Sequence, residues 1–86
     1  MSIELVIDIN CVSLKMFIGM IKKLIKEFPN KEIKIVSFYS NEQRMKKLGI
    51  NILPAWIIDD EVILVNPTDY ASIKKKVNQK LNQQQD

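Results

Sequence analysis

Cys11 is the one cysteine in this chain of 86 residues, and its thiol is the side chain best suited to covalent chemistry. A cysteine thiolate attacks disulfides and binds soft metal ions. The chain has no histidine, so a catalytic pair of serine or cysteine with histidine is excluded. One cysteine without histidine also falls short of the usual ligand set of a zinc site. We therefore expect no metal and no cofactor, and we expect any chemistry to lie at Cys11.

Three aspartates are the other candidates for chemistry. Asp59 and Asp60 are adjacent, but two aspartates between short apolar runs are typical of a solvated hairpin turn. Asp8 precedes Cys11 by three residues and could take up the proton of its thiol. The other interpretation of Asp8, which we favour, is local hydrogen bonding that closes the end of a strand.

Cys11 lies between a predicted strand and a predicted long helix. Residues 3–9 alternate with the period of a strand, with four apolar residues on one side. Residues 12–28 change to the period of a helix. One apolar stripe follows that helix, made of Leu14, Phe17, Ile18, Ile21, Leu24, Ile25 and Phe28, and it is flanked by Met16 and Met20. Cys11 would then stand at the helix N-terminus, where unpaired N–H groups, the helix dipole and Lys15 favour a thiolate.

A second strand and a short helix are predicted next. The strand covers residues 33–38 and should run parallel to the first, because a strand, a helix and a strand in this order form a right-handed crossover. Ser40 with Gln43 three residues later predicts a capping box. The helix that it begins should run from about Asn41 to Leu48, and Gly49 should end it in a left-handed conformation.

The last third of the chain predicts a hairpin and a final helix. Two short apolar runs, residues 55–58 and 61–64, flank Asp59-Asp60. Asn66 is a good N-cap and Pro67 suits the first helical position, so the segment 66–69 should open the helix. Its apolar face would be Tyr70, Ile73, Val77 and Leu81. The chain is thus expected to form one α/β domain over residues 1–82, β-α-β-α-β-β-α, with a four-stranded mixed sheet, helices on both faces and a frayed tail at 83–86.

Composition narrows the class of protein. The net charge of +3 comes mainly from lysines that alternate with apolar helix positions, so we favour solvated helix faces over a nucleic-acid partner. Weak binding of nucleic acid by a basic surface is the other interpretation, and its dependence on salt would reveal it. No apolar run approaches the ~20 residues of a membrane helix, and no secretory signal is visible at the N-terminus. A lone cysteine fits a reducing compartment. We therefore expect a cytoplasmic protein without a membrane partner.

One stretch of the chain resembles the second half of thioredoxin and glutaredoxin domains. In residues 46–62 a short helix ends at Gly49, an apolar link leads to Pro54, and a hairpin follows. The order of elements over nearly the whole chain is similar to the same superfamily, and most of all to its small archaeal and bacterial members. The resemblance implies a cis peptide bond between Leu53 and Pro54. It also implies that Cys11 stands where the first cysteine of the C-x-x-C motif stands.

The resemblance has clear departures. Leu14 stands where the second cysteine of the motif would be, and Ser13 is one position too early for a monothiol C-x-x-S motif. Residues 65–68 also lack the Gly-Gly-x-Asp segment with which glutaredoxins contact glutathione. Dithiol oxidoreductase activity is therefore not expected, and whether the chain is an enzyme stays open. The strand order still predicts that Cys11 and Pro54 are neighbours, because the third strand should pair antiparallel to the first.

Two functions follow from these residues. In the first, Cys11 is a lone nucleophile in thiol–disulfide exchange with a protein or a low-molecular-weight thiol. In the second, Cys11 is a small packed residue and the chain is a non-catalytic binding module, with Leu53, Pro54 and Trp56 holding an extended peptide. Trp56 either lines a groove beside Cys11 or covers the sheet, and we favour packing because a tryptophan dominates a small core. We expect a monomer or a weak dimer.

Overall fold

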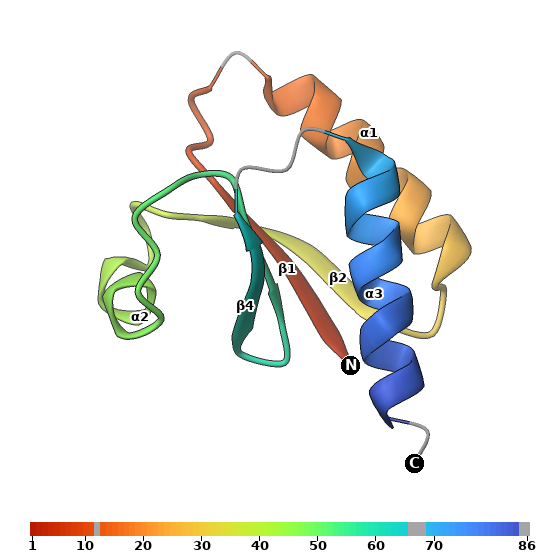
Figure 1. Ribbon diagram of the computed structural model, residues 1–86. Coiled ribbons are helices and arrows are strands. Elements are labelled where there is room, and N and C mark those ends of the chain that lie inside the picture. The colour runs from red at the N-terminus through yellow and green to blue at the C-terminus, as the bar shows by residue number, and fades with distance from the viewer. Residues whose placement is uncertain (12, 66–68, 85–86) are drawn as a thin grey trace.

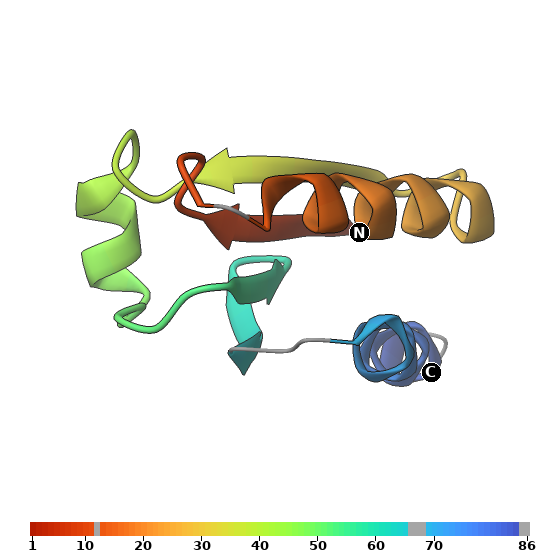
Figure 2. The ribbon, with the colours of Figure 1, turned by 90° about the horizontal axis from the view of Figure 1, so that it is seen from above.

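The computed structural model describes residues 1–11, 13–65 and 69–84. The chain folds in the predicted order β-α-β-α-β-β-α. The elements are β1 (Ser2–Ile7), α1 (Leu14–Glu27), β2 (Glu32–Ser37), α2 (Glu42–Lys47), β3 (Ala55–Ile58), β4 (Glu61–Val65) and α3 (Tyr70–Gln84). They form three layers, with α1 and α3 on one face of the sheet and α2 on the other (Figure 1, Figure 2).

The four strands form one mixed sheet in the order β2-β1-β3-β4. β1 pairs in parallel with β2, from Ser2 opposite Glu32 to Ile7 opposite Ser37. β1 pairs antiparallel with β3, and β3 pairs antiparallel with β4. β1 is therefore a central strand with neighbours on both sides and helices over both faces.

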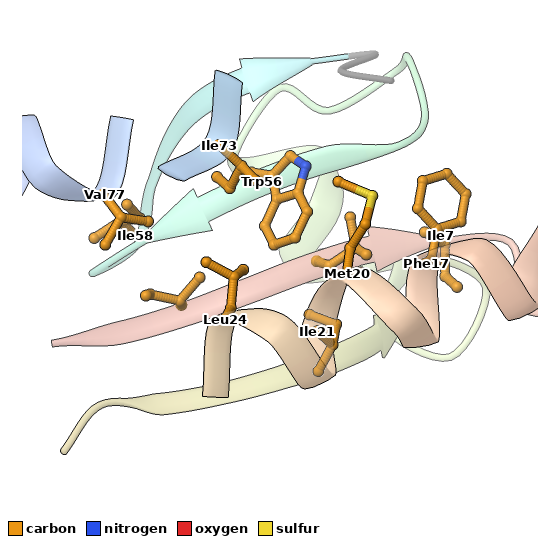
Figure 3. Packing of buried hydrophobic residues seen from close by; sticks show 11 residues of the cluster. Ile7, Phe17, Met20, Ile21, Leu24, Trp56, Ile58, Ile73 and Val77 are labelled. Carbon is orange, nitrogen blue, oxygen red and sulfur yellow. The ribbon is translucent and has the colours of Figure 1, made fainter. Parts of the chain in front are cut away.

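The predicted alternation of β1 is confirmed, although the strand is shorter than predicted. Ile3, Leu5 and Ile7 pack with α1 and α3, whereas Val6 packs on the α2 side. The strand ends at Ile7, and Ile9, which was predicted as its last inward residue, is 50% exposed. The core between the sheet and the two long helices is apolar and contains Phe17, Met20, Ile21, Leu24, Trp56, Ile58, Ile73 and Val77 (Figure 3).

The buried stripe of α1 differs from the prediction. Met20 is buried, while Ile18 and Ile25 are 37% and 48% exposed. The reason is the position of α3, which lies along the side of α1 that carries Lys23 and Glu27. Met20 is closer to that side and is covered, whereas Ile18 and Ile25 lie on the side turned away from α3.

The short helix α2 packs through Met45, which is fully buried against Val6, Ala55 and Ile57. The predicted capping box at Ser40 is wrong. Asn41 is the N-cap residue, and no side chain caps the helix. The side-chain amide of Asn41 donates instead to the carbonyl oxygen of Ser37 at 2.9 Å. Gly49 ends the helix at φ +72°, as predicted.

The hairpin and the last helix follow the sequence closely. Asp59 and Asp60 both adopt positive φ, +49° and +63°, at the turn between β3 and β4. α3 begins at Tyr70, and the carboxylate of Asp69 accepts the backbone N–H of Ser72 at 3.1 Å. The predicted opening residues Asn66 and Pro67 lie outside the described residues. α3 runs to Gln84, so it includes part of the expected polar tail. Among the helices described, none has the length and apolar character needed to cross a membrane.

Candidate thiol site at one end of the sheet

Cys11 lies in the turn that joins β1 to α1. Its backbone N–H donates to the carbonyl oxygen of Asp8 at 3.0 Å, and its own carbonyl oxygen accepts the N–H of Leu14 at 3.3 Å. The carboxylate of Asp8 accepts the backbone N–H of Asn10 at 3.0 Å. Asp8 therefore closes the end of β1 by local hydrogen bonds, which is the interpretation that the sequence favoured.

The long helix begins later than predicted, and this changes the surroundings of the thiol. α1 starts at Leu14 with Ser13 as its N-cap, not at residue 12. Cys11 therefore precedes the N-cap by two residues. The field of a helix dipole falls off within about one turn, so its effect on Cys11 is weaker than that expected for a residue at the cap. Lys15 is also not one helical turn from Cys11, because Cys11 is not helical.

The side chain of Cys11 is half-buried. It packs against the apolar core between the sheet and the helices α1 and α3. Both interpretations of Cys11 thus keep a physical basis. The contact with the core is that of a small apolar residue, and the residue is not fully enclosed, as a reactive thiol requires.

Leu53 and Pro54 lead into β3 at the same end of the sheet as Cys11. The peptide bond between them is cis, as the resemblance implied. The antiparallel register pairs Val6 of β1 with Ala55 of β3, so the start of β3 lies beside the end of β1 (Figure 1). Leu53 and Pro54 are both half-buried. Direct contact of Cys11 with Pro54 stays a prediction.

Trp56 is fully buried. Its indole lies in the core among Leu24 of α1, Ile73 of α3 and Met20 (Figure 3). A side chain that solvent does not reach cannot form the surface of a peptide groove. Trp56 therefore supports the strand beside Pro54 from within, which is the packing role weighed in the sequence.

Four exposed apolar residues lie at the Cys11 end of the sheet, and the sequence did not single them out. They are Ile9 after β1, Tyr39 after β2, Ile52 before β3 and Val65 at the end of β4. Strand direction brings them to this end, because β1, β2 and β4 finish there and β3 starts there. We call these four residues the apolar rim. Only the strand order reveals it, since no local pattern links the four positions.

A charged cluster on the face of the sheet that α2 covers was also not predicted from the sequence. Arg44 of α2 donates to both carboxylate oxygens of Glu4 in β1, and also to Asp60 at 2.7 Å. The Nζ of Lys34 lies 3.7 Å from Glu4. The bonds to Glu4, and then those to Asp60, raise the pKa of Arg44 above its ordinary value. Asp60 is thus more than a solvated turn residue. Asp59 also has a structural contact, because its carboxylate accepts the backbone N–H of Ser2 at 2.8 Å.

Residues 1–11, 13–65 and 69–84 contain no group of three or more histidine, cysteine, aspartate or glutamate side chains that could hold a metal ion. The carboxylates of Glu4 and Asp60 are engaged by Arg44.

The sheet order, the placement of the helices and the cis proline before β3 define a thioredoxin fold with one cysteine. The chain is similar over 100% of both chains to thioredoxin 1 from the thermophilic eubacterium Thermosipho africanus TCF52B, with a TM-score of 0.77 and 17% identity. It is similar to thioredoxin O2 from Arabidopsis thaliana in the oxidized state, with a TM-score of 0.66 and 17% identity. That match covers 91% of this chain and 72% of the plant chain.

No model of a protein family matches the chain, and no curated protein matches it. An identity of 17% establishes the fold alone. The activity must therefore be argued from the residues at the Cys11 end of the sheet.

Proposed function

We propose that this chain takes part in thiol–disulfide exchange through Cys11 alone. The observation that carries the proposal is the position of Cys11, a half-buried residue in the turn between β1 and α1 of a thioredoxin fold. The turn fixes the backbone of Cys11 by two hydrogen bonds, to Asp8 and from Leu14. A residue that is not fully enclosed can meet a disulfide without unfolding of the chain.

The reaction requires a second thiol from another molecule. The Cys11 thiolate attacks one sulfur of a disulfide, the disulfide bond breaks, and the other sulfur leaves as a thiolate. The product is a mixed disulfide between Cys11 and the first sulfur. An external thiolate then attacks this mixed disulfide, releases Cys11 as a thiolate and forms a new disulfide with the first sulfur. Electrons balance in each step, and no residue at position 14 is needed because the external thiol does the work of a resolving cysteine.

The test begins with oxidised glutathione as the probe. The intact mass of the protein should rise by one glutathione, and reduced glutathione should reverse the change. Cys11→Ser should show no change in mass. Turnover of a disulfide substrate in the presence of reduced glutathione should then exceed that of Cys11→Ser. Failure of the native, folded protein to form the adduct would contradict the proposal.

The apolar rim supports a second candidate function, that of a non-catalytic binding module. Ile9 and Ile52 are 50% and 51% exposed. Ile52 directly precedes Leu53 and Pro54, and Ile9 follows the end of β1, beside which β3 starts. Exposed apolar side chains at one end of a sheet suit an extended apolar peptide. In this function Cys11 is a packing residue, and the sulfur has no chemical role.

Selection from a library of displayed random peptides distinguishes the two functions. A binding module should enrich apolar peptides that bind Cys11→Ser as well as the native protein. Ile52→Asp should abolish their binding, while Ile25→Asp, an equally drastic change at an exposed isoleucine of α1, should not. If no peptide is enriched and the glutathione adduct forms at Cys11, thiol–disulfide exchange remains as the only one of the two functions.

A further inference from the structure

β2 is the outermost strand of the sheet. β1 pairs with one of its sides, and no strand in the described parts of the chain pairs with the other. Unpaired N–H and C=O groups on an edge strand are a template for pairing with a strand of another chain. β2 is six residues long and contains no proline that would interrupt such pairing.

The backbone groups that face this free side can be assigned. The N–H of Glu32 donates to the carbonyl oxygen of Met1 at 3.3 Å, and the N–H of Phe38 donates to that of Ile7 at 2.9 Å. Both bonds run towards β1. Because the direction of these groups alternates along a strand, Ile33 and Ile35 turn their N–H and C=O groups towards the free side.

The side chains of β2 complement a second copy of the same strand. Glu32 and Lys34 are exposed and lie on one face, with Ile33 between them on the other. In an antiparallel pair with a two-fold axis through Ile33, Glu32 lies opposite Lys34 of the second copy, and this contact occurs twice. The two Ile33 residues then exchange both of their backbone hydrogen bonds.

Other registers lose this match of charges. An axis through Lys34 places the two lysines opposite each other, which is unfavourable. An axis through Ile35 places Lys34 opposite Val36. Glu32 and Lys34 therefore favour one register with a second copy of β2, and they disfavour strands that do not offer the opposite charges at these positions.

α1 adds apolar surface beside the same edge. Its side towards α3 is occupied, since Lys23 lies 5.3 Å from the ring of Tyr70 and Glu27 pairs with Lys74 at 2.8 Å. Ile18 and Ile25 are on the side away from α3, and both are exposed. α1 packs over β1 and β2, so these two isoleucines lie on the side of the free edge. A two-fold axis perpendicular to the sheet brings the same face of α1 from both copies together.

We propose that β2, with Ile18 and Ile25 of α1, forms the interface of a homodimer in which the two sheets join into one. The occupant of the free edge is a second copy of this chain, paired through Ile33. This inference goes beyond the proposed thiol chemistry. The antiparallel joint sends the two Cys11 residues to opposite ends of the joined sheet, so the dimer contains no Cys11–Cys11 disulfide. An interface of one short strand and part of a helix is small, and the dimer dissociates at low concentration.

The first experiment is sedimentation velocity of the whole chain from micromolar to millimolar concentration, with and without reductant. The mass should rise reversibly towards that of a dimer, and Cys11→Ser should behave like the native chain. Glu32→Lys should raise the dissociation constant roughly tenfold, because two attractive contacts become repulsive. Glu42→Lys makes the same charge change at an exposed residue of α2 and should leave the constant unchanged.

The second experiment fixes the register in the Cys11→Ser background. Ile33→Cys should form a covalent dimer on mild oxidation, because paired residues lie about 5.5 Å apart between Cα atoms, within the range of a disulfide. Ile35→Cys should not, since residue 35 then lies opposite residue 31 of the second copy. A chain that stays monomeric at millimolar concentration, a dimer that is lost in Cys11→Ser, or equal effects of Glu32→Lys and Glu42→Lys would overturn the proposal. A covalent dimer through residue 35 and not 33 would overturn the register.

Discussion

The guanidinium group of Arg44 in α2 donates to both carboxylate oxygens of Glu4 in β1, at 3.2 Å to Oε1 and 2.6 Å to Oε2. Glu4 is only 6% exposed although its side chain is charged, because it lies on the central strand of the sheet. The pair fastens α2 to the sheet, and the bond from Arg44 to Asp60 extends it to the hairpin turn. The segment that follows α2 leads to Leu53 and Pro54, so this pair helps to hold that segment at the Cys11 end.

Arg44→Ala should destabilise the fold substantially. It removes the paired hydrogen bonds of a buried carboxylate and leaves Lys34, at 3.7 Å, as the nearest positive charge. The free energy of unfolding should fall by about 2–4 kcal/mol, measured by urea denaturation. Lys46→Ala, at an exposed position of the same helix, should change it by less than about 0.5 kcal/mol. In the Glu4→Gln background the loss from Arg44→Ala should shrink, and equal losses in both backgrounds would show that the pair contributes no coupling.

Leu14→Cys should create a dithiol site. The hydrogen bond from the N–H of Leu14 to the carbonyl oxygen of Cys11 closes a turn, and the ends of such a turn lie within about 7 Å between Cα atoms. Disulfides need a separation of about 4.4–6.8 Å. We expect an internal disulfide after oxidation and loss of both titratable thiols. The reduced variant should also reduce a disulfide substrate completely without an external thiol, which the native chain cannot do because it stops at the mixed disulfide. Leu14→Ser removes the same half-buried leucine without adding sulfur, and it should stop at the mixed disulfide unless an external thiol is added. Two free thiols after oxidation would contradict this geometry.

Tyr70 should make stability depend on pH in the alkaline range. Burial, and then the negative charge of Glu27, raise the pKa of Tyr70 from 10.0 to about 12. The folded state therefore favours the neutral phenol more than the unfolded state does. This stabilisation is complete below pH 10 and is lost as the pH rises towards 12. The melting temperature of the native chain should therefore fall more steeply over that pH range than the melting temperature of Tyr70→Phe. Tyr39→Phe, at a tyrosine that is 62% exposed, should retain the native profile.

The two glycines should respond in opposite ways to the same substitution. Gly49 has φ +72°, so Gly49→Ala should cost about 1–2 kcal/mol of unfolding free energy. Gly19 lies within α1, and a Cβ there would meet no atom within 4 Å. Gly19→Ala should therefore stabilise the chain by about 0.5–1 kcal/mol, because alanine favours a helix more than glycine does. Urea denaturation of the two variants measures both values, and equal signs would contradict the assignment of one conformation or the other.

The order of elements could be predicted because each element carries a local pattern. The alternation of residues 3–7, the helical spacing in α1 and the turn at Asp59-Asp60 each involve residues close together in the chain. The parallel pairing of β1 and β2 followed from the crossover rule, and the cis bond at Pro54 followed from the resemblance to thioredoxins.

The wrong predictions concern ends and sides of elements. The start of α1 at Leu14 and the failure of Ser40 to cap α2 arise at helix ends, where several local hydrogen-bonding patterns compete with small differences in energy. The exposure of Ile18 and Ile25 depends on where α3 packs, and no pattern within α1 contains that information.

By itself the sequence determined which segments form strands and helices, where the chain turns, and that one thiol without histidine or a second cysteine limits the chemistry. Only the tertiary structure decided that Glu4 is paired with Arg44, that Trp56 is buried, that the apolar rim gathers at the Cys11 end, and that β2 keeps a free edge. The physical reason is the range of the forces. Backbone propensity and side-chain spacing act within a few residues, whereas burial and charge pairing join residues 40 or more positions apart and exist only once the layers have packed.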